Sequence, residues 1–286
     1  VRLATEEMEN VGESARREAA GRFGLNSERD CVEYMPAGSV MQKDELKHEL
    51  ILLAAEGNAV QEHVNILEEA GVIPVAIDTI PCALFRTFER SLRRYEDRDR
   101  TIVCVDLGSN YTTVVFGRQG QINLVKKINI GGNRFIDEIS NRLGVTSSEA
   151  ELLRVSLRRD RKDELLEGQS GSLDATTRQG IVDAIGMVSE ELAREIALCF
   201  KYYTVTFKGR QVERAVFSGG EAYENILLNS LRRQLTVEVE IAQPLKGFDL
   251  MSVDFNKDKR EALCEWTVAA GLSLKGIRKP EPAVAG

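Results

Sequence analysis

One carboxylate and a group of small polar residues stand where an apolar strand gives way to a turn. Residues 102–105 are apolar, Asp106 follows them, and residues 107–113 (LGSNYTT) lead into a second strand. Glycine lets backbone N–H groups approach phosphate oxygens, and hydroxyl groups add donors. A carboxylate can hold water around a magnesium ion. The turn therefore suits the phosphate tail of a nucleotide, and an ordinary hairpin with a polar turn explains the same residues equally well.

Two further glycine-bearing turns follow expected strands. Gly131-Gly132 comes after residues 122–130, and Gly219-Gly220 comes after residues 214–217. Each pair leads into a helix, and helix N-termini favour anions. A Gly-Gly pair after a strand is usually no more than a turn. Together, however, the three turns stand in the order expected for a two-lobed fold that closes on a nucleotide.

Composition limits the classes of function. The 286 residues allow one large domain or two of ordinary size. A net charge of −7 and a pI of about 5.2 argue against nucleic acid as the main partner. The five cysteines lie far apart and form no CxxC pair, so we expect reduced core residues. No apolar run reaches membrane-spanning length and no signal peptide is visible, so direct membrane insertion is not expected.

The elements that must position these turns alternate between strands and helices. Before residue 93 the pattern predicts a polar helix at 3–22, a strand at 50–55, a helix at 59–70, a strand at 73–77 and a helix at 80–92. After residue 100 it predicts strands at 102–105, 112–117, 122–130, 214–217 and 237–241, and helices through 135–143, 149–157, 176–203, 222–234 and 257–273, with a loop or weak helix at 158–172.

Charge and composition also suggest how the chain is divided. Residues 93–100 alternate in charge and predict a solvated connection. It would join a small α/β subdomain with its lead-in helix (1–92) to a nucleotide-binding lobe (101–278), and the Pro-bearing tail 279–286 is expected to be disordered. The chain begins at Val1, without Met and inside a helical pattern, so we expect an N-terminal segment to be missing.

Several stretches resemble a known family. VDLGSNYTTVVF is similar to the second phosphate loop of the actin-like ATPase superfamily, AVFSGGEA to its adenosine-contact motif, and residues 269–272 (AAGL) to its second connecting motif. INIGGNRFIDEISNRLGVTSSEAELLR, AGVIPVAIDTIPCALFRTF and FSGGEAYENILLNSLRRQLTVEVEIAQPLKGF narrow the resemblance to the PilM family of type IV pilus assembly proteins, relatives of the division protein FtsA. The resemblance covers nearly all of residues 13–275. It implies an α/β fold with actin-like (ribonuclease H-like) lobes, mixed sheets and a small α/β subdomain.

The resemblance also implies a site for ATP and Mg²⁺. Asp106, Gly108, Ser109, Asn110 and Thr112 would line the β/γ-phosphates, with Asp106 acting on Mg²⁺ through water; Gly131 and Gly132 would approach the sugar or phosphates; Glu151 and Arg154 would reach the ribose and adenine; and Gly219, Gly220 and Glu221 would close the adenosine pocket.

The sequence departs from the family's pattern at two places, and some of the named residues have another possible role. Arg154 stands where the family usually has Lys. The family's first phosphate loop, an Asp-x-Gly strand, does not occur before residue 101, so the chain as written holds part of an ATP site. The Asp106 side chain could instead cap its own turn, and Glu151 and Arg154, three residues apart, could form a surface ion pair.

The function implied by the resemblance is a cytoplasmic, nucleotide-binding scaffold. It would lie at the inner membrane through its partners, bind the cytoplasmic segment of a PilN-like inner-membrane protein beside the small subdomain, and associate with other pilus assembly proteins. Hydrolysis is expected to be slow at most, because no general base is visible. The alternatives are a sugar or acetate kinase of the same superfamily, a scaffold that has lost its nucleotide, and an FtsA-like division or secretion scaffold.

Overall fold

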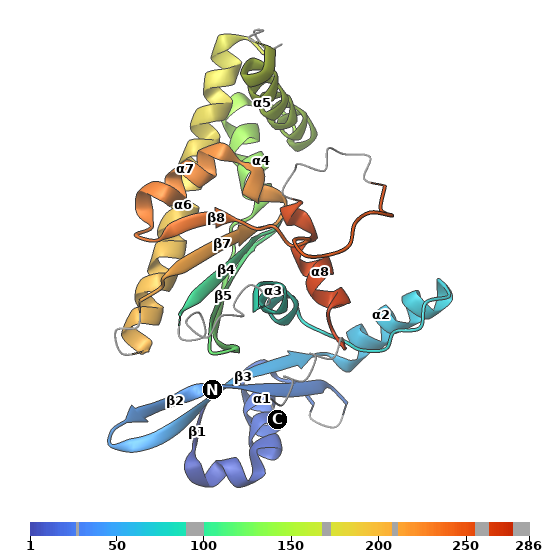
Figure 1. Ribbon diagram of the computed structural model, residues 1–286, viewed down its shortest axis with the longest axis vertical. Coiled ribbons are helices and arrows are strands. Elements are labelled where there is room, and N and C mark those ends of the chain that lie inside the picture. Colours follow the sequence, from blue (N-terminus) through green and yellow to red (C-terminus); the bar gives the residue numbers. More distant parts are fainter. Residues whose placement is uncertain (27–28, 90–99, 168–172, 208–210, 255–262, 277–286) are drawn as a thin grey trace, which may run out of the picture.

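The computed structural model describes residues 1–26, 29–89, 100–167, 173–207, 211–254 and 263–276. They form a large α/β part around a five-stranded sheet and a three-stranded sheet near one end of the molecule (Figure 1). The side chains of residues 159–167 lie outside this description.

The five-stranded sheet has the order β6-β5-β4-β7-β8. Its strands are β4 (Ile102–Leu107), β5 (Thr112–Arg118), β6 (Gln121–Ile128), β7 (Arg214–Ser218) and β8 (Glu238–Ile241). The first three pair antiparallel, whereas β4, β7 and β8 run parallel. The nearly continuous apolar run of β4 suits a central strand that is covered on both faces. The expected α/β class with a mixed sheet is confirmed.

Helices cover both faces of this sheet. On one face, the ring of Phe116 in β5 stacks on Tyr203 of α6 (Ala175–Thr206), with ring centroids 4.7 Å apart. The next residue, Gly117, points to the opposite face, where an added Cβ would lie 2.0 Å from the ring of Phe85 in α3 (Ile80–Glu89). Three further helices gather around α6, namely α4 (Gly132–Leu143), α5 (Ser147–Glu167) and α7 (Asn225–Gln234) (Figure 1).

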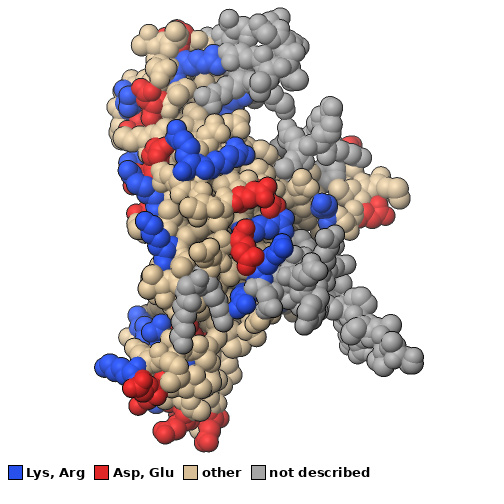
Figure 2. Space-filling model, turned by 60° about the vertical axis from the view of Figure 1, so that its left-hand side comes forward, with Lys and Arg blue, Asp and Glu red and all other residues tan. Residues whose placement is uncertain are grey.

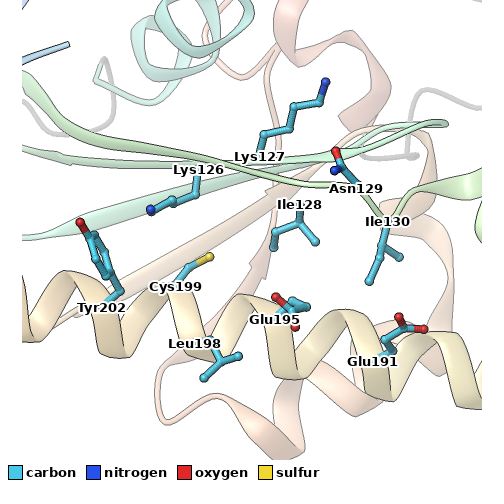
Figure 3. Close-up of a pocket in the computed structure, with 10 residues that line it drawn as sticks. All are labelled: Lys126, Lys127, Ile128, Asn129, Ile130, Glu191, Glu195, Leu198, Cys199 and Tyr202. Atoms are coloured by element: carbon cyan, nitrogen blue, oxygen red, sulfur yellow. The ribbon is translucent and has the colours of Figure 1, made fainter. Parts of the chain in front are cut away.

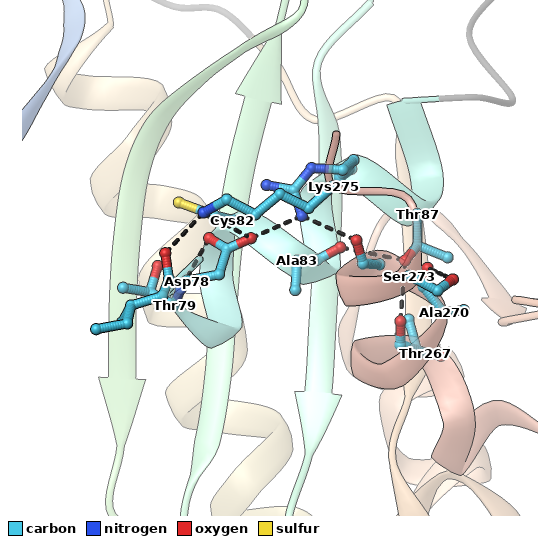
Figure 4. A network of polar contacts seen from close by, with 12 residues as sticks. Asp78, Thr79, Cys82, Ala83, Thr87, Thr267, Ala270, Ser273 and Lys275 are labelled. Carbon is cyan, nitrogen blue, oxygen red and sulfur yellow. Dashed lines mark hydrogen bonds and ion pairs between the residues drawn. The ribbon is translucent and has the colours of Figure 1, made fainter. Parts of the chain in front are cut away.

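The face of α3 meets α8 (Thr267–Ser273) at very close range. A Cβ added at Gly271 would lie 1.9 Å from the carbonyl oxygen of Ala83. Polar contacts fasten the same junction: Arg86 Nη1 donates to the Gly271 carbonyl at 2.8 Å and pairs with Asp78 at 2.8 Å. Lys275 Nζ donates to the Ile77 carbonyl at 2.7 Å (Figure 4). The chain that leads into α3 is thereby tied to the last described helix.

The smaller sheet is antiparallel throughout. It consists of β1 (Arg2–Ala4), β3 (Glu45–Ala55) and β2 (Cys31–Gln42), in that order, and carries the 3-10 helix η1 (Thr5–Asn10) and α1 (Val11–Phe23). Lys43 and Asp44 both have positive φ, as a two-residue hairpin turn between β2 and β3 requires. The predicted helix at 3–22 is wrong at its start, because residues 2–4 pair with residues 47–49 of β3.

Some of the other helices and strands expected from the sequence are confirmed, and others are wrong. The helix α2 (Gly57–Glu69) is confirmed. The strand expected at 73–77 is wrong: the segment has no ladder partner among the described residues, and Val75 is 96% exposed. The helix expected at 149–157 continues to residue 167, and the described part of the helix expected at 257–273 includes α8, which spans Gly271. Thr146 and Glu149 form a capping box at the start of α5: the N–H and hydroxyl of Thr146 donate to Glu149, and the N–H of Glu149 donates to the Thr146 hydroxyl.

The division into domains stays a prediction. Most of the expected connection at 93–100, the start of the last predicted helix and the tail 279–286 lie outside the described residues. The helix α3, which that division assigns to the small subdomain, packs on β4 and β5 of the larger sheet. Within the described ranges, no helix is both long and apolar enough to cross a membrane. On the face shown in Figure 2, acidic and basic side chains are interspersed.

Candidate nucleotide site

The carboxylate of Asp106 lies beside the third glycine-bearing turn. The parallel pairing of β4 with β7 places Asp106 opposite Ser218 in register. The Ser218 hydroxyl is buried, 3.2 Å from the Val105 carbonyl and 3.4 Å from Asp106 Oδ1. Two turns that are more than a hundred residues apart in sequence therefore meet at the carboxyl ends of β4 and β7.

Gly219 is a position that only glycine fits. Its φ is +90°, and an added Cβ would lie 2.4 Å from the carbonyl oxygen of Leu107. Its N–H donates to the Cys264 carbonyl at 3.0 Å. By contrast, a Cβ added at Gly220 would meet nothing within 4 Å, so the surface beside that residue is open. The third turn thus touches β4 with its first glycine and leaves space beside its second.

The second turn packs directly on the first. The N–H groups of Gly132 and Asn133 donate to the carbonyls of Gly108 and Ser109, at 2.9 Å and 2.7 Å. A Cβ added at Gly131 would lie 2.6 Å from each of those two carbonyl oxygens. Two of the donors that a helix N-terminus usually offers to an anion are therefore taken by the neighbouring turn. All three turns converge, and this glycine pair serves the contact between them.

The structure separates the predicted residues by their access to solvent. Ser109, Asn110 and Gly220 are exposed, and Asp106, Gly108 and Glu221 are partly exposed. Gly131, Gly132 and Gly219 are buried, and so is Thr112, whose hydroxyl donates to the Ile130 carbonyl at 2.8 Å. In this geometry Thr112 holds the turns together and does not face a ligand. The expectation that Thr112 lines the phosphates is therefore corrected to a supporting role.

The environment of Asp106 favours its protonated form. Burial raises the pKa of this carboxyl above its ordinary value, and the hydroxyl of Ser218 offsets part of that rise. A cation beside the carboxylate would favour the charged form. A carboxylate with a shifted pKa beside an exposed polar turn is a candidate functional group.

A buried ion network lies next to these turns. Arg154, whose side chain is 5% exposed, donates to Glu221 at 2.5 Å and to the Gly132 carbonyl at 3.4 Å, and it lies over the ring of Phe135. Arg158 bonds to Glu221 at 2.9 Å and to Glu224 at 3.2 Å. Burial lowers the pKa of the Arg154 guanidinium, which the charge of Glu221 offsets, and an arginine stays charged.

This network corrects two sequence interpretations. The alternative of a surface pair between Glu151 and Arg154 is wrong, because Glu151 is exposed on α5 while Arg154 is buried against Glu221. Arg158, which the sequence pattern assigns to a loop or weak helix, lies on α5 and reaches two carboxylates. The sequence did hold one signal: Arg154 and Arg158 are four residues apart and so share a helix face. The place of Glu151 at the ribose stays a prediction.

Replacing Arg154 by Met should destabilise the protein by about 2–3 kcal/mol, because it leaves two largely buried carboxylates with one cation fewer. The matched change Arg158→Met should have a smaller effect, because that side chain is one-third exposed. Urea unfolding of both variants measures the difference. Equal loss of stability in the two variants would contradict the assigned importance of Arg154.

Comparisons with known proteins match this chain to one family and to one solved complex. The family described as "Type IV pilus assembly protein PilM" matches residues 23–175 and 182–277. No curated protein gives a significant match. A chain of the PilM-PilN type IV pilus biogenesis complex is 22% identical and superposes with a TM-score of 0.73, over 98% of this chain and 76% of that chain.

Two other solved structures are more distant. The ethanolamine utilization protein EutJ from Carboxydothermus hydrogenoformans is 20% identical, with a TM-score of 0.45 over 62% of this chain and 54% of that chain. Bacillus thuringiensis ParM with ATP is 12% identical, with a TM-score of 0.40 over 60% and 45%. The argument therefore rests on the family match and on the fold shared with the pilus complex. The chain shares its fold with the chain of the pilus complex, and by the family match it belongs to the PilM family of type IV pilus assembly proteins.

Proposed function

We propose that this chain is a nucleotide-binding scaffold of type IV pilus assembly that binds ATP with Mg²⁺ where the three glycine-bearing turns meet. The observation that carries the proposal is the convergence of Asp106, the first turn and Gly219 at the carboxyl ends of β4 and β7. A partly exposed carboxylate with a raised pKa stands there beside an exposed polar turn and an open glycine. Family membership supports the role in pilus assembly.

Each group at these strand ends has a separate role in the proposed site. Asp106 would hold water on Mg²⁺, and the exposed residues Ser109 and Asn110 would face the phosphates. Bound ATP supplies the phosphate charge that the metal neutralises. Gly220 would lie along the adenosine, and a ribose hydroxyl at Glu221 would compete with Arg154 and Arg158 for that carboxylate. Nucleotide binding and the buried ion network are thereby coupled, and any hydrolysis is expected to be slow.

The proposed partner is the cytoplasmic segment of a PilN-like inner-membrane protein. The solved complex to which this chain is similar is a PilM-PilN assembly. We place the segment beside the small sheet, and other pilus assembly proteins would join the same scaffold. The protein would then lie in the cytoplasm, peripheral to the inner membrane through its partners. A nucleotide that changes the angle between lobes changes partner affinity only through differential binding to the two states.

Calorimetry of the full-length protein tests the nucleotide role. We expect ATP to bind in the presence of Mg²⁺ and to bind at least about tenfold more weakly when the metal is chelated, because a metal-bridged phosphate contact contributes on the order of 1.4 kcal/mol or more. A synthetic peptide of the PilN-like cytoplasmic segment should then bind with different affinity with and without ATP.

Two results would favour the alternatives. Absence of any heat with Mg-ATP, together with normal peptide binding, would indicate a nucleotide-free scaffold. Robust phosphate transfer to a panel of small hydroxyl or carboxyl substrates would indicate a kinase instead.

A further inference from the structure

A hollow of about 480 Å³ lies away from the three turns, between the end of β6 and the middle of α6 (Figure 3). Five consecutive residues from Lys126 to Ile130 form one wall, and α6 forms the other. In Figure 3 Ile128 and Ile130 point toward α6, whereas Lys127 and Asn129 point the other way. Side chains of a strand alternate between faces, so a hollow that borders residues of both orientations reaches the backbone of the strand.

That backbone belongs to an edge. In the sheet formed by the described residues, β6 is the outermost strand next to β5. An edge strand presents backbone N–H and C=O groups that another chain can pair with, and proteins commonly cover or charge such edges. Near its start β6 is covered by β2, where Asn123 Nδ2 donates to the Ala37 carbonyl at 3.0 Å, whereas residues 126–130 border an open hollow.

The helix wall supplies apolar contact, and the two ends of the groove carry opposite charges. Leu198 is 54% exposed and Tyr202 is 48% exposed, although both lie on α6. At one end Lys126 lies 4.2 Å from the centre of the Tyr202 ring. At the other end stand Glu195 and Glu191, the latter 3.7 Å from Arg134. Burial raises the pKa of the Cys199 thiol between these ends, so that sulfur packs as a small apolar group.

We infer that this groove, defined by residues 126–130 and by Glu195, Leu198 and Tyr202 of α6, docks an extended segment of a partner polypeptide that adds as a strand to the β6 edge. Strand addition takes affinity from backbone hydrogen bonds and specificity from alternate side chains. Charge complementarity defines the occupant: an acidic residue at the Lys126 end, a basic residue at the Glu195 end, and an apolar residue between them over Leu198. The inference does not depend on nucleotide binding, because the groove uses no residue of the three turns.

Selection from a phage-displayed library of seven-residue peptides tests the inference. The full chain and the charge-swapped variant Lys126→Glu/Glu195→Lys serve as two baits. We expect the wild-type protein to enrich peptides with one acidic and one basic end around an apolar residue, and the swapped variant to enrich the reverse order. The most enriched synthetic peptide should slow hydrogen exchange of the amides in residues 126–130.

A matched pair of apolar substitutions measures the affinity. Leu198→Asp should weaken binding of that peptide at least about tenfold. Leu152→Asp makes the same change at another exposed leucine, on α5, and should leave the affinity unchanged. Both positions are exposed, so circular dichroism should show the fold retained in each variant.

Four outcomes would overturn the inference. Both baits enrich the same peptides, or neither bait enriches any. Leu198→Asp does not weaken peptide binding, or sedimentation velocity shows a dimer that Leu198→Asp dissociates. The last result would identify a second copy of this chain as the occupant.

Discussion

Replacing Gly271 by Ala should destabilise the protein by about 3 kcal/mol, the largest effect we expect from a single methyl group in this chain. The added carbon would lie 1.9 Å from the carbonyl oxygen of Ala83 and 2.7 Å from the hydroxyl of Thr87. The first of these atoms is backbone, so no side-chain rotation relieves the overlap. The helices α3 and α8 must separate, and that movement also strains the bond from Arg86 to the Gly271 carbonyl.

Urea unfolding followed by circular dichroism measures this loss, with Gly186→Ala as the control. Gly186 lies inside α6, and a Cβ there meets nothing within 4 Å. Because alanine favours a helix over glycine, this second change should raise the free energy of unfolding by up to about 1 kcal/mol. If Gly271→Ala unfolds within 0.5 kcal/mol of the wild type, roughly the scatter of neutral surface changes, the tight crossing of α3 and α8 is wrong.

The variant Asp106→Ala should bind Mg-ATP about 10–100-fold more weakly than the wild type in calorimetry, because contacts to a charged group contribute about 1.5–3 kcal/mol. The fold should survive, since the side chain is partly exposed at the end of β4 and packs little of the core. Asp137→Ala removes an exposed carboxylate from α4 and should leave the affinity unchanged. Equal affinity of Asp106→Ala and the wild type would remove Asp106 from the proposed site.

The isosteric variant Asp106→Asn adds a pH-dependent test. The pKa of Asp106 is raised in the folded protein, so the cost of ionising this carboxyl in the folded state begins above its ordinary pKa and is complete above the raised value. Below the ordinary pKa both the folded and the unfolded states are protonated, and the penalty vanishes. Without nucleotide, Asp106→Asn should therefore melt above the wild type at pH 7. The difference in melting temperature should shrink as the pH falls below the raised pKa and vanish below the ordinary pKa. A variant that melts below the wild type at pH 7 would contradict this environment for Asp106.

Local signals in the sequence were enough for most elements of the larger sheet. The meander β4-β5-β6 follows from apolar runs separated by Gly108 and Gly120, and α6 follows from an apolar stripe at helical spacing. These features depend on neighbours within a few residues, which the chain order alone supplies. The family resemblance then implied that the three turns lie together around one nucleotide.

The small sheet shows where local signals failed. Residues 2–4 read as the start of a helix, but they pair with β3 more than forty residues later. Residues 73–77 read as a strand, but no described strand lies beside them. A strand is stable only when a partner satisfies its backbone groups, and the position of that partner is a property of the whole fold.

By itself the sequence determined that three glycine-bearing turns follow three strands and that Asp106 ends the first of those strands. Only the tertiary structure decided that β7 lies parallel to β4, which brings Ser218 to Asp106 across 112 residues, and that Arg154 turns inward to Glu221 across 67 residues. The physical reason is that strand pairing and the burial of charge are long-range choices. A carboxylate or guanidinium removed from water must find its partner wherever the fold places one, and local periodicity does not record that place.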